Sequence, residues 1–291
     1  MCLASFTEKW LNGVELIVNT IKVQQAGNDE DHPSPAYRFN RRTEVATDTL
    51  MMQGYGPPTT RCGLSKCFFR PSDDATTFPF LIPANAMAAV ELERVAAIIS
   101  QIYTKYADPQ RALSIVSSAR TIAAEIRAGI LQQAVVNHPK YGQIIAYEVD
   151  GFGSSYFMDD ANIPGLLSLP YIGYIEKTDP LYLRTRQFVL SPSNPFYFAG
   201  TQAQGIGGPH IGYGYVWPMG LCIQALTSDD DTEILSILTT LKSTTAGTNF
   251  MHESFWMDDA NSFTRVWFAW ANTLFAELIL TLSEERPHLI F

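Results

Sequence analysis

The segment ANAMAAVELERVAAIISQIYTKY, residues 84–106, is the clearest guide to the fold class, because its apolar side chains recur every three or four positions. That spacing places them on one face of an α-helix. Pro109 interrupts the pattern, which resumes over about residues 110–136. Two long amphipathic helices with a short connection predict a helical hairpin. The apolar positions are Met87, Val90, Val95, Ile98, Ile99, Ile102 and Tyr106 in the first helix, and Leu113, Val116, Ile122, Ile126, Ile130 and Val135 in the second.

Helical periodicity continues outside this hairpin and alternates with long loops. The loops are rich in glycine and aromatic residues, and no segment shows the sustained alternation of a strand. Hairpins of this kind, with their long loops at one end, predict an all-α toroid that forms a single domain over residues 1–291. The last helix is apolar almost all round, so we expect it to be buried on most sides. Further helices are expected over 7–24, 163–175, 179–189, 216–227, 230–243 and 264–283, and long loops over 26–82, 137–162, 191–214 and 244–263.

The composition is poor in charge and rich in aromatic rings. Charged residues make up 17% and aromatic residues 12% of the 291 residues, and the formal net charge is -9. A nucleic-acid-binding protein needs a basic surface, so this class is excluded. No apolar run is long enough to cross a membrane, and the first ten residues lack the regions of a signal peptide. The four cysteines, Cys2, Cys62, Cys67 and Cys222, are expected to be free thiols because they are too few for a disulfide framework.

Acidic residues stand beside aromatic residues in the loops over 69–75, 147–162 and 251–256, and the glycine-rich loop over 205–210 ends in His210. Glycoside hydrolysis needs carboxyl groups in pairs, one to protonate the leaving oxygen and one on the other face of the sugar. An apolar wall around the first carboxyl group keeps it protonated near neutral pH. These loops therefore favour a glycosidase.

The same motifs also have structural interpretations. An Asp-Asp pair such as Asp73-Asp74 or Asp159-Asp160 is a common helix N-cap. His210 follows a Gly-Gly-Pro turn and is as typical of a turn as of a binding site, and His252-Glu253 also fits a surface pair. The sequence contains neither a His-Glu-x-x-His motif nor an EF-hand loop, so no metal site is predicted.

Five segments in series resemble glycoside hydrolase family 125. They are 69–85 (FRPSDDATTFPFLIPAN), 158–162 (MDDAN), 166–171 (LLSLPY), 251–255 (MHESF) and 268–272 (FAWAN), and the similarity runs in order from about Phe6 to Leu282. The resemblance implies an exo-acting, inverting α-mannosidase that needs neither metal nor cofactor and favours α-1,6 linkages. It also implies an (α/α)6 barrel and a mannose-containing oligosaccharide or glycan as the partner.

The resemblance also implies roles for individual residues. The general acid lies in Ser72-Asp73-Asp74, where sequence does not distinguish Asp73 from Asp74, and the general base corresponds to Glu253. Because they all lie in the long loops, Asp73/Asp74, Asp159/Asp160, His210 and Glu253 are expected at one end of the toroid. The residues expected to contact the sugar are Arg70, Asp150, Asp159, Asp160, His210, Trp217, His252 and Trp256.

One departure from the family concerns the N-terminal side. Family members are longer and carry a Trp-Leu-Arg-Asp segment, which this sequence lacks. The resemblance therefore implies a toroid without its N-terminal third, with low stability, doubtful activity and an exposed apolar patch around Trp267, Phe268, Leu274 and Phe275. Two alternatives follow: a catalytically inactive carbohydrate-binding or structural remnant, and another inverting (α/α)6 glycosidase such as a glucan hydrolase.

Overall fold

The computed structural model describes residues 5–31 and 37–291. The chain folds as two compact units, which are described separately. Unit 1 comprises Met1–Val136 and Ala146–Tyr156, and unit 2 comprises Asn137–Ile145 and Phe157–Phe291.

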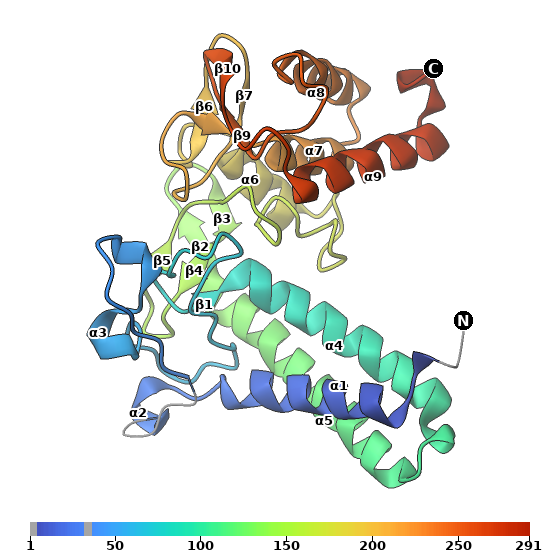
Figure 1. The fold of residues 1–291 in the computed structure, drawn as a ribbon. Helices are drawn as coiled ribbons and strands as arrows, with labels where there is room; N and C mark the ends of the chain where they lie inside the picture. The colour runs from blue at the N-terminus through green and yellow to red at the C-terminus, as the bar shows by residue number, and fades with distance from the viewer. Residues whose placement is uncertain (1–4, 32–36) are drawn as a thin grey trace. The chain divides into compact units, whose positions relative to one another are not determined.

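The three longest elements of unit 1 are the helices α1 (Glu8–Val23), α4 (Ile82–Ile102) and α5 (Pro109–Gly129). α5 packs against both α4 and α1, as Figure 1 shows. Its first turn is fixed by Asp108, whose carboxylate accepts a hydrogen bond from the amide of Arg111 at 3.0 Å. The predictions over 7–24 and 84–106 are confirmed.

The helix predicted over 110–136 ends earlier than expected. α5 continues into a π-helical turn, η4 (Ile130–Ala134), and then into strand β2 (Val135–His138). Shorter elements complete unit 1. They are α2 (Asn28–Asp31), η2 (Ala46–Asp48), α3 (Met51–Gly54), η3 (Tyr103–Lys105) and the antiparallel sheet of β1 (Phe80–Leu81), β4 (Glu148–Val149) and β5 (Ser155–Tyr156), in the order β1-β4-β5.

Unit 2 contains helices α6 (Pro180–Val189), α7 (Pro218–Leu226), α8 (Asp231–Ser243) and α9 (Ala269–Glu285), followed by η5 (Pro287–Leu289). α7 packs against α8 and α9 (Figure 1). The predictions over 179–189, 216–227 and 230–243 are confirmed. The helix predicted over 163–175 is wrong, because that segment folds as successive turns. Pro170 lacks an amide donor, and Gly173 has a φ of 84°, which no α-helix accommodates.

Short strands occupy several of the predicted loops, so the all-helical prediction is only partly correct. The chain is rich in helices but carries several small sheets. In unit 2, β6 (Tyr197–Ala199) pairs with β7 (Gln204–Ile206), and β8 (Tyr215–Val216), β9 (Ser254–Trp256) and β10 (Asp259–Thr264) form a sheet in the order β10-β9-β8. β2 pairs with β3 (Gly142–Ile145) where the chain passes from unit 1 into unit 2.

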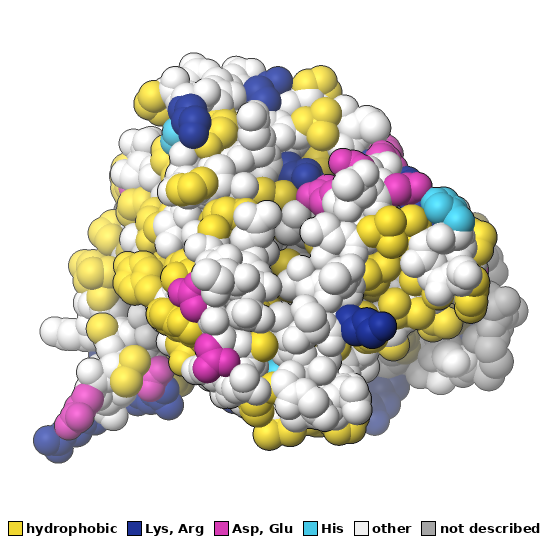
Figure 2. Space-filling view, turned by 90° about the horizontal axis from the view of Figure 1, so that it is seen from above, with side chains coloured by type: hydrophobic (Ala, Val, Ile, Leu, Met, Phe, Trp, Pro, Cys, Tyr) yellow, Lys and Arg dark blue, Asp and Glu magenta, His cyan; other side chains and the backbone are white. Residues whose placement is uncertain are grey.

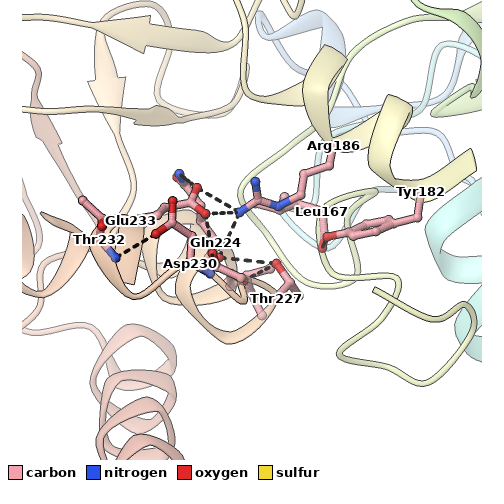
Figure 3. Close-up of polar contacts among 10 residues, drawn as sticks. Leu167, Tyr182, Arg186, Gln224, Thr227, Asp230, Thr232 and Glu233 are labelled. Atoms are coloured by element: carbon pink, nitrogen blue, oxygen red, sulfur yellow. Dashed lines mark hydrogen bonds and ion pairs between the residues drawn. The ribbon is translucent and has the colours of Figure 1, made fainter. Parts of the chain in front are cut away.

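A half-buried polar network ties α6 to α7 and α8 (Figure 3). Arg186 Nη2 lies 2.9 Å from both carboxylate oxygens of Glu233 and donates to the carbonyl of Gln224 at 3.2 Å. Gln224 in turn donates to Glu233 at 2.7 Å. Burial alone raises the pKa of Glu233, but hydrogen bonds from Gln224 and Ser228 and the charge of Arg186 bring it below its usual range. One carboxylate thus holds three helices together.

Uncharged polar, backbone and hydrophobic atoms predominate on the face drawn in Figure 2, where charged side chains are few and several acidic ones gather near a histidine. The last helix is not buried on most sides. Trp267, just before it, is 56% exposed and Trp270 is 54% exposed, whereas Leu274 is 6% exposed. Of the four residues expected in the apolar patch, Trp267 is exposed, Phe268 and Phe275 are partly exposed, and Leu274 is buried.

Cys62, Cys67 and Cys222 are free thiols, as predicted. Burial raises the pKa of Cys67 to about 11 and that of Cys222 to about 12. Cys2 lies outside the described residues. Within residues 5–31 and 37–291, no helix combines the length and hydrophobicity that crossing a bilayer requires.

Candidate active-site residues

A tight turn in unit 1 presents Asp73 and Asp74 in different environments. The amide of Asp73 donates to the carbonyl of Arg70 at 2.9 Å, and the amide of Arg70 donates to the carbonyl of Asp74 at 2.8 Å. Asp73 has a φ of 72°, in the left-handed region that Asp tolerates better than most residues. Its side chain is exposed, whereas Asp74 is buried and accepts a hydrogen bond from Ser72 Oγ at 3.1 Å.

Arg70 anchors this turn to β4 through a buried ion pair with Glu148. Arg70 Nε lies 2.7 Å from Glu148 Oε1, and the two side chains are 4% and 0% exposed. The other carboxylate oxygen of Glu148 accepts the amides of Thr77 and Phe78 at 2.9 and 3.0 Å. Burial raises the pKa of Glu148, and the charge of Arg70 opposes that rise. Sequence reasoning missed Glu148, although an acidic residue between Tyr147 and Val149 in an apolar run was a signal.

Asp150, also in unit 1, closes a glycine-containing turn. Its Oδ1 accepts the amides of Phe152 at 2.8 Å and Ser154 at 3.0 Å. Gly151 has a φ of 82°, and a Cβ there would lie 2.6 Å from the carbonyl oxygen of Thr60. The Asp150 carboxylate is therefore hydrogen-bonded to backbone amides of its own turn.

Asp159 in unit 2 holds the turn that follows it. Its two carboxylate oxygens accept the amides of Leu166 at 2.7 Å and Leu167 at 2.9 Å. The carbonyl of Leu167 accepts a hydrogen bond from the Tyr182 hydroxyl at 2.9 Å, and Figure 3 shows this tyrosine on α6. Asp159 is fully buried, and this burial raises the pKa of its carboxyl group to about 7.

Asp160 lies against the glycine-rich loop that ends in His210. Its Oδ1 accepts both the amide and the side-chain Nδ2 of Asn162, at 2.9 and 2.8 Å. A Cβ at Gly208 would lie 3.1 Å from the same oxygen, and the amide of Ala161 donates to the carbonyl of Gly207 at 2.9 Å. The Asp159-Asp160 loop and the Gly207-Gly208 loop are therefore neighbours within unit 2, although Gly207 follows Asp160 by 47 positions along the chain.

Glu253 is connected to other predicted residues of unit 2 by a series of side-chain contacts. Its side chain is 5% exposed, and Oε1 lies 3.1 Å from Nε of Arg265, whose side chain is 61% exposed. The Arg265 guanidinium lies 5.6 Å from the ring centre of Phe268. Phe268 packs edge-on against Trp217 at 6.3 Å, and Trp217 packs edge-on against His210 at 6.5 Å. The structure thus links three predicted residues, Glu253, Trp217 and His210, through Arg265 and Phe268, which sequence reasoning did not assign to the site.

His252 and Trp256 flank Glu253 and differ in their surroundings. The His252 ring is 1% exposed, stacks on Phe263 with ring centres 3.9 Å apart, and has both nitrogens at backbone carbonyls, those of Val266 (2.8 Å) and Thr245 (3.2 Å). Trp256 is partly exposed, and its ring occupies the space that a Cβ of Gly214 would need.

Trp217 carries a polar atom that the fold does not satisfy. The side chain is 1% exposed, and no hydrogen-bond partner of its buried Nε1 occurs in the part of the chain that the structure describes. A buried indole N–H usually finds a partner. Trp217 is therefore a buried donor that the described residues leave unsatisfied.

Comparison with known proteins gives three concordant similarities. The sequence model of the metal-independent alpha-mannosidase family (GH125) matches residues 2–280. The "Meiotically up-regulated gene 157 protein" of Schizosaccharomyces pombe is 48% identical over 291 residues, which cover 98% of this chain and 56% of the yeast protein.

A solved structure is similar along almost the whole chain. It is a metal-independent alpha mannosidase from Streptococcus pneumoniae, in a non-productive complex with alpha-1,6-mannobiose, with a TM-score of 0.90 and 39% sequence identity. The similarity covers 97% of this chain and 64% of the streptococcal one. The chain thus spans less than two thirds of the length of both relatives.

Proposed function

Because the chain belongs to the family of metal-independent α-mannosidases, glycoside hydrolase family 125, we propose that the protein is an exo-acting, inverting α-mannosidase that favours α-1,6 linkages. The observation that carries this proposal is the similarity to a structure solved with alpha-1,6-mannobiose. The substrate proposed here is a mannose-terminated oligosaccharide or glycan. The finer architecture, an (α/α)6 toroid of helical hairpins, is part of the same proposal.

Glu253 is the proposed general base. An inverting hydrolase needs one ionised carboxylate to deprotonate the attacking water. Among the described residues, Glu253 combines burial with an ion pair to Arg265, which lies nearest Oε1, and neither carboxylate oxygen accepts a hydrogen bond. The oxygen away from Arg265, Oε2, is therefore the one proposed to accept the proton of a water molecule.

Asp73 is the proposed general acid, in preference to Asp74. Its side chain is exposed at the tip of the Arg70–Asp74 turn, so its carboxyl group is able to reach a glycosidic oxygen. Asp74 is buried and bonded to Ser72, which suits a residue that shapes the turn.

The proposed sugar contacts fall into two groups. His210, Trp217 and Trp256 are proposed to touch the sugar directly, through an exposed ring, a buried indole N–H without a partner and a partly exposed ring. The other predicted residues are proposed to act by fixing loop shape, because at least one polar atom of each is held by a neighbouring backbone or side-chain group. They are Arg70, Asp150, Asp159, Asp160 and His252.

Hydrolysis of α-1,6-mannobiose, compared with that of an α-1,6-linked glucose disaccharide, tests the proposal. The mannoside should be the better substrate by kcat/KM. D73N should lose most of the turnover, and D74N should lose stability as well as turnover. A preference for the glucoside would favour another inverting glycosidase, and binding of mannobiose without hydrolysis would favour the inactive carbohydrate-binding alternative.

A further inference from the structure

Two paired backbone segments, one containing Glu253 and the other Thr264 and Arg265, determine that Arg265 lies beside the Glu253 side chain. The amide of Glu253 donates to the carbonyl of Thr264 at 3.3 Å, and the hydroxyl groups of Ser254 and Thr264 lie 2.7 Å apart. The chain then leaves β10 at Arg265, whose φ of 47° is in the left-handed region. A non-glycine residue with such a φ is uncommon, and the strain persists only where the surroundings impose it.

Further contacts hold the chain on the side of this pair opposite to Ser254 and Thr264. His252 Nδ1 lies 2.8 Å from the carbonyl oxygen of Val266. The amide of Met251 donates to Asn272 Oδ1 at 3.0 Å, and Asn272 Nδ2 donates back to the carbonyl of Met251 at 2.8 Å. The backbone geometry that brings Arg265 to Glu253 is therefore fixed from both ends.

We propose that Arg265 is a positioning residue for Glu253, an inference that rests on the proposed function of Glu253 as the base. The guanidinium offsets the cost of keeping a carboxylate charged in a nearly dry environment. Because Arg265 engages Oε1, it orients the carboxylate so that Oε2 faces the attacking water. The Phe268 ring under the guanidinium limits its movement in turn.

Two substitutions at Arg265 and one matched control test the inference. R265Q removes the charge but leaves the same backbone strain, since Gln also carries a Cβ. We expect kcat on α-1,6-mannobiose to fall about 10–100-fold, the scale of a misplaced reacting group, while KM changes less than about twofold and the melting temperature is retained. R265K should recover part of kcat because it restores the charge.

The control is R94Q, because Arg94 is similarly exposed (55%) and also pairs with a glutamate, Glu91, but lies on α4 of unit 1. It should leave kcat unchanged. A loss in R265Q that appears in KM, or that R265K does not recover at all, would overturn the positioning role.

A double-variant comparison separates action through Glu253 from action on the sugar. On an activated aryl α-mannoside, E253Q/R265Q should be as active as E253Q alone, because the group that Arg265 orients is already lost. A further loss in the double variant would show that Arg265 acts elsewhere. If E253Q is inactive while R265Q retains full kcat, only the Arg265 proposal fails. If E253Q retains full turnover, the proposed function itself fails.

Discussion

Two arginine–carboxylate pairs, one in each unit, differ chiefly in the exposure of the arginine. In unit 1, Arg70 is 4% exposed and Glu148 is 0% exposed, and two backbone amides occupy the second carboxylate oxygen. In unit 2, the Glu253 side chain is 5% exposed, but Arg265 is 61% exposed. The first pair is enclosed and holds a turn in place. The second is an ion pair only, and no hydrogen bond to either carboxylate oxygen of Glu253 occurs among the described residues, which leaves them available for chemistry.

The largest expected effect is on turnover at the second pair. E253Q preserves the volume of the side chain and removes the base, so kcat on α-1,6-mannobiose should fall about 10²–10⁴-fold, the usual contribution of general base catalysis. The melting temperature should change by only a few degrees. Steady-state kinetics and differential scanning calorimetry measure the two quantities. If E253Q unfolds, or if its kcat is undiminished, the Arg265–Glu253 pair would not differ from the Arg70–Glu148 pair in serving catalysis rather than stability.

The first pair should instead respond in stability. R70M leaves the Glu148 charge buried without its partner, which typically costs about 3–5 kcal/mol of unfolding free energy. R94M, which breaks the exposed pair with Glu91, should cost less than about 1 kcal/mol. Urea unfolding measures both. Equal stability of the two variants would mean that the buried pair contributes no more than a surface one.

A smaller effect concerns pH and Asp159. Its pKa is raised from 3.8 to about 7 by burial, so the native state retains a proton that the unfolded state releases. The free energy of unfolding should therefore fall as the pH rises from about 4 to 7, by a few kcal/mol at most. Unfolding of D159N over this range should show a flatter dependence. An identical slope in D159N would contradict the assignment.

The smallest expected effect is that of a chelator. The family to which the chain belongs is metal-independent, and arginines accompany the carboxylates of both pairs. EDTA should therefore leave the initial rate of mannobiose hydrolysis unchanged within error. A rate that disappears with EDTA and returns with Ca²⁺ would contradict this expectation.

The sequence predicted long helices well because their signal is local. The apolar period of α1, α4 and α6 lies within each segment, and local caps mark helix starts, such as Asp108 before α5 and Asp179 before α6. The small sheets escaped prediction because their pairing is distant: Phe80 pairs with Val149, and Val216 pairs with Phe255. A strand of two or three residues is too short to show alternation.

Sequence analysis identified the candidate-site residues that stand in recognisable motifs, but not those whose role depends on a contact formed by folding. Asp73 and Glu253 stand in recognisable segments, although their roles remain proposals. Glu148 and Arg265 were missed because their importance arises from partners that folding supplies. Arg265 reaches Glu253 only because β10 pairs with β9 and the chain then turns through a left-handed residue. No pattern within residues 259–268 specifies that turn.

The most direct test of the account is the configuration of the first sugar released from α-1,6-mannobiose, followed by proton NMR. Inversion by Asp73 and Glu253 predicts β-mannose as the initial product, with α-mannose appearing only by later mutarotation. The E253Q variant should release neither anomer at a comparable rate. α-Mannose as the initial product would indicate retention of configuration and would contradict the proposed pair of carboxyl groups.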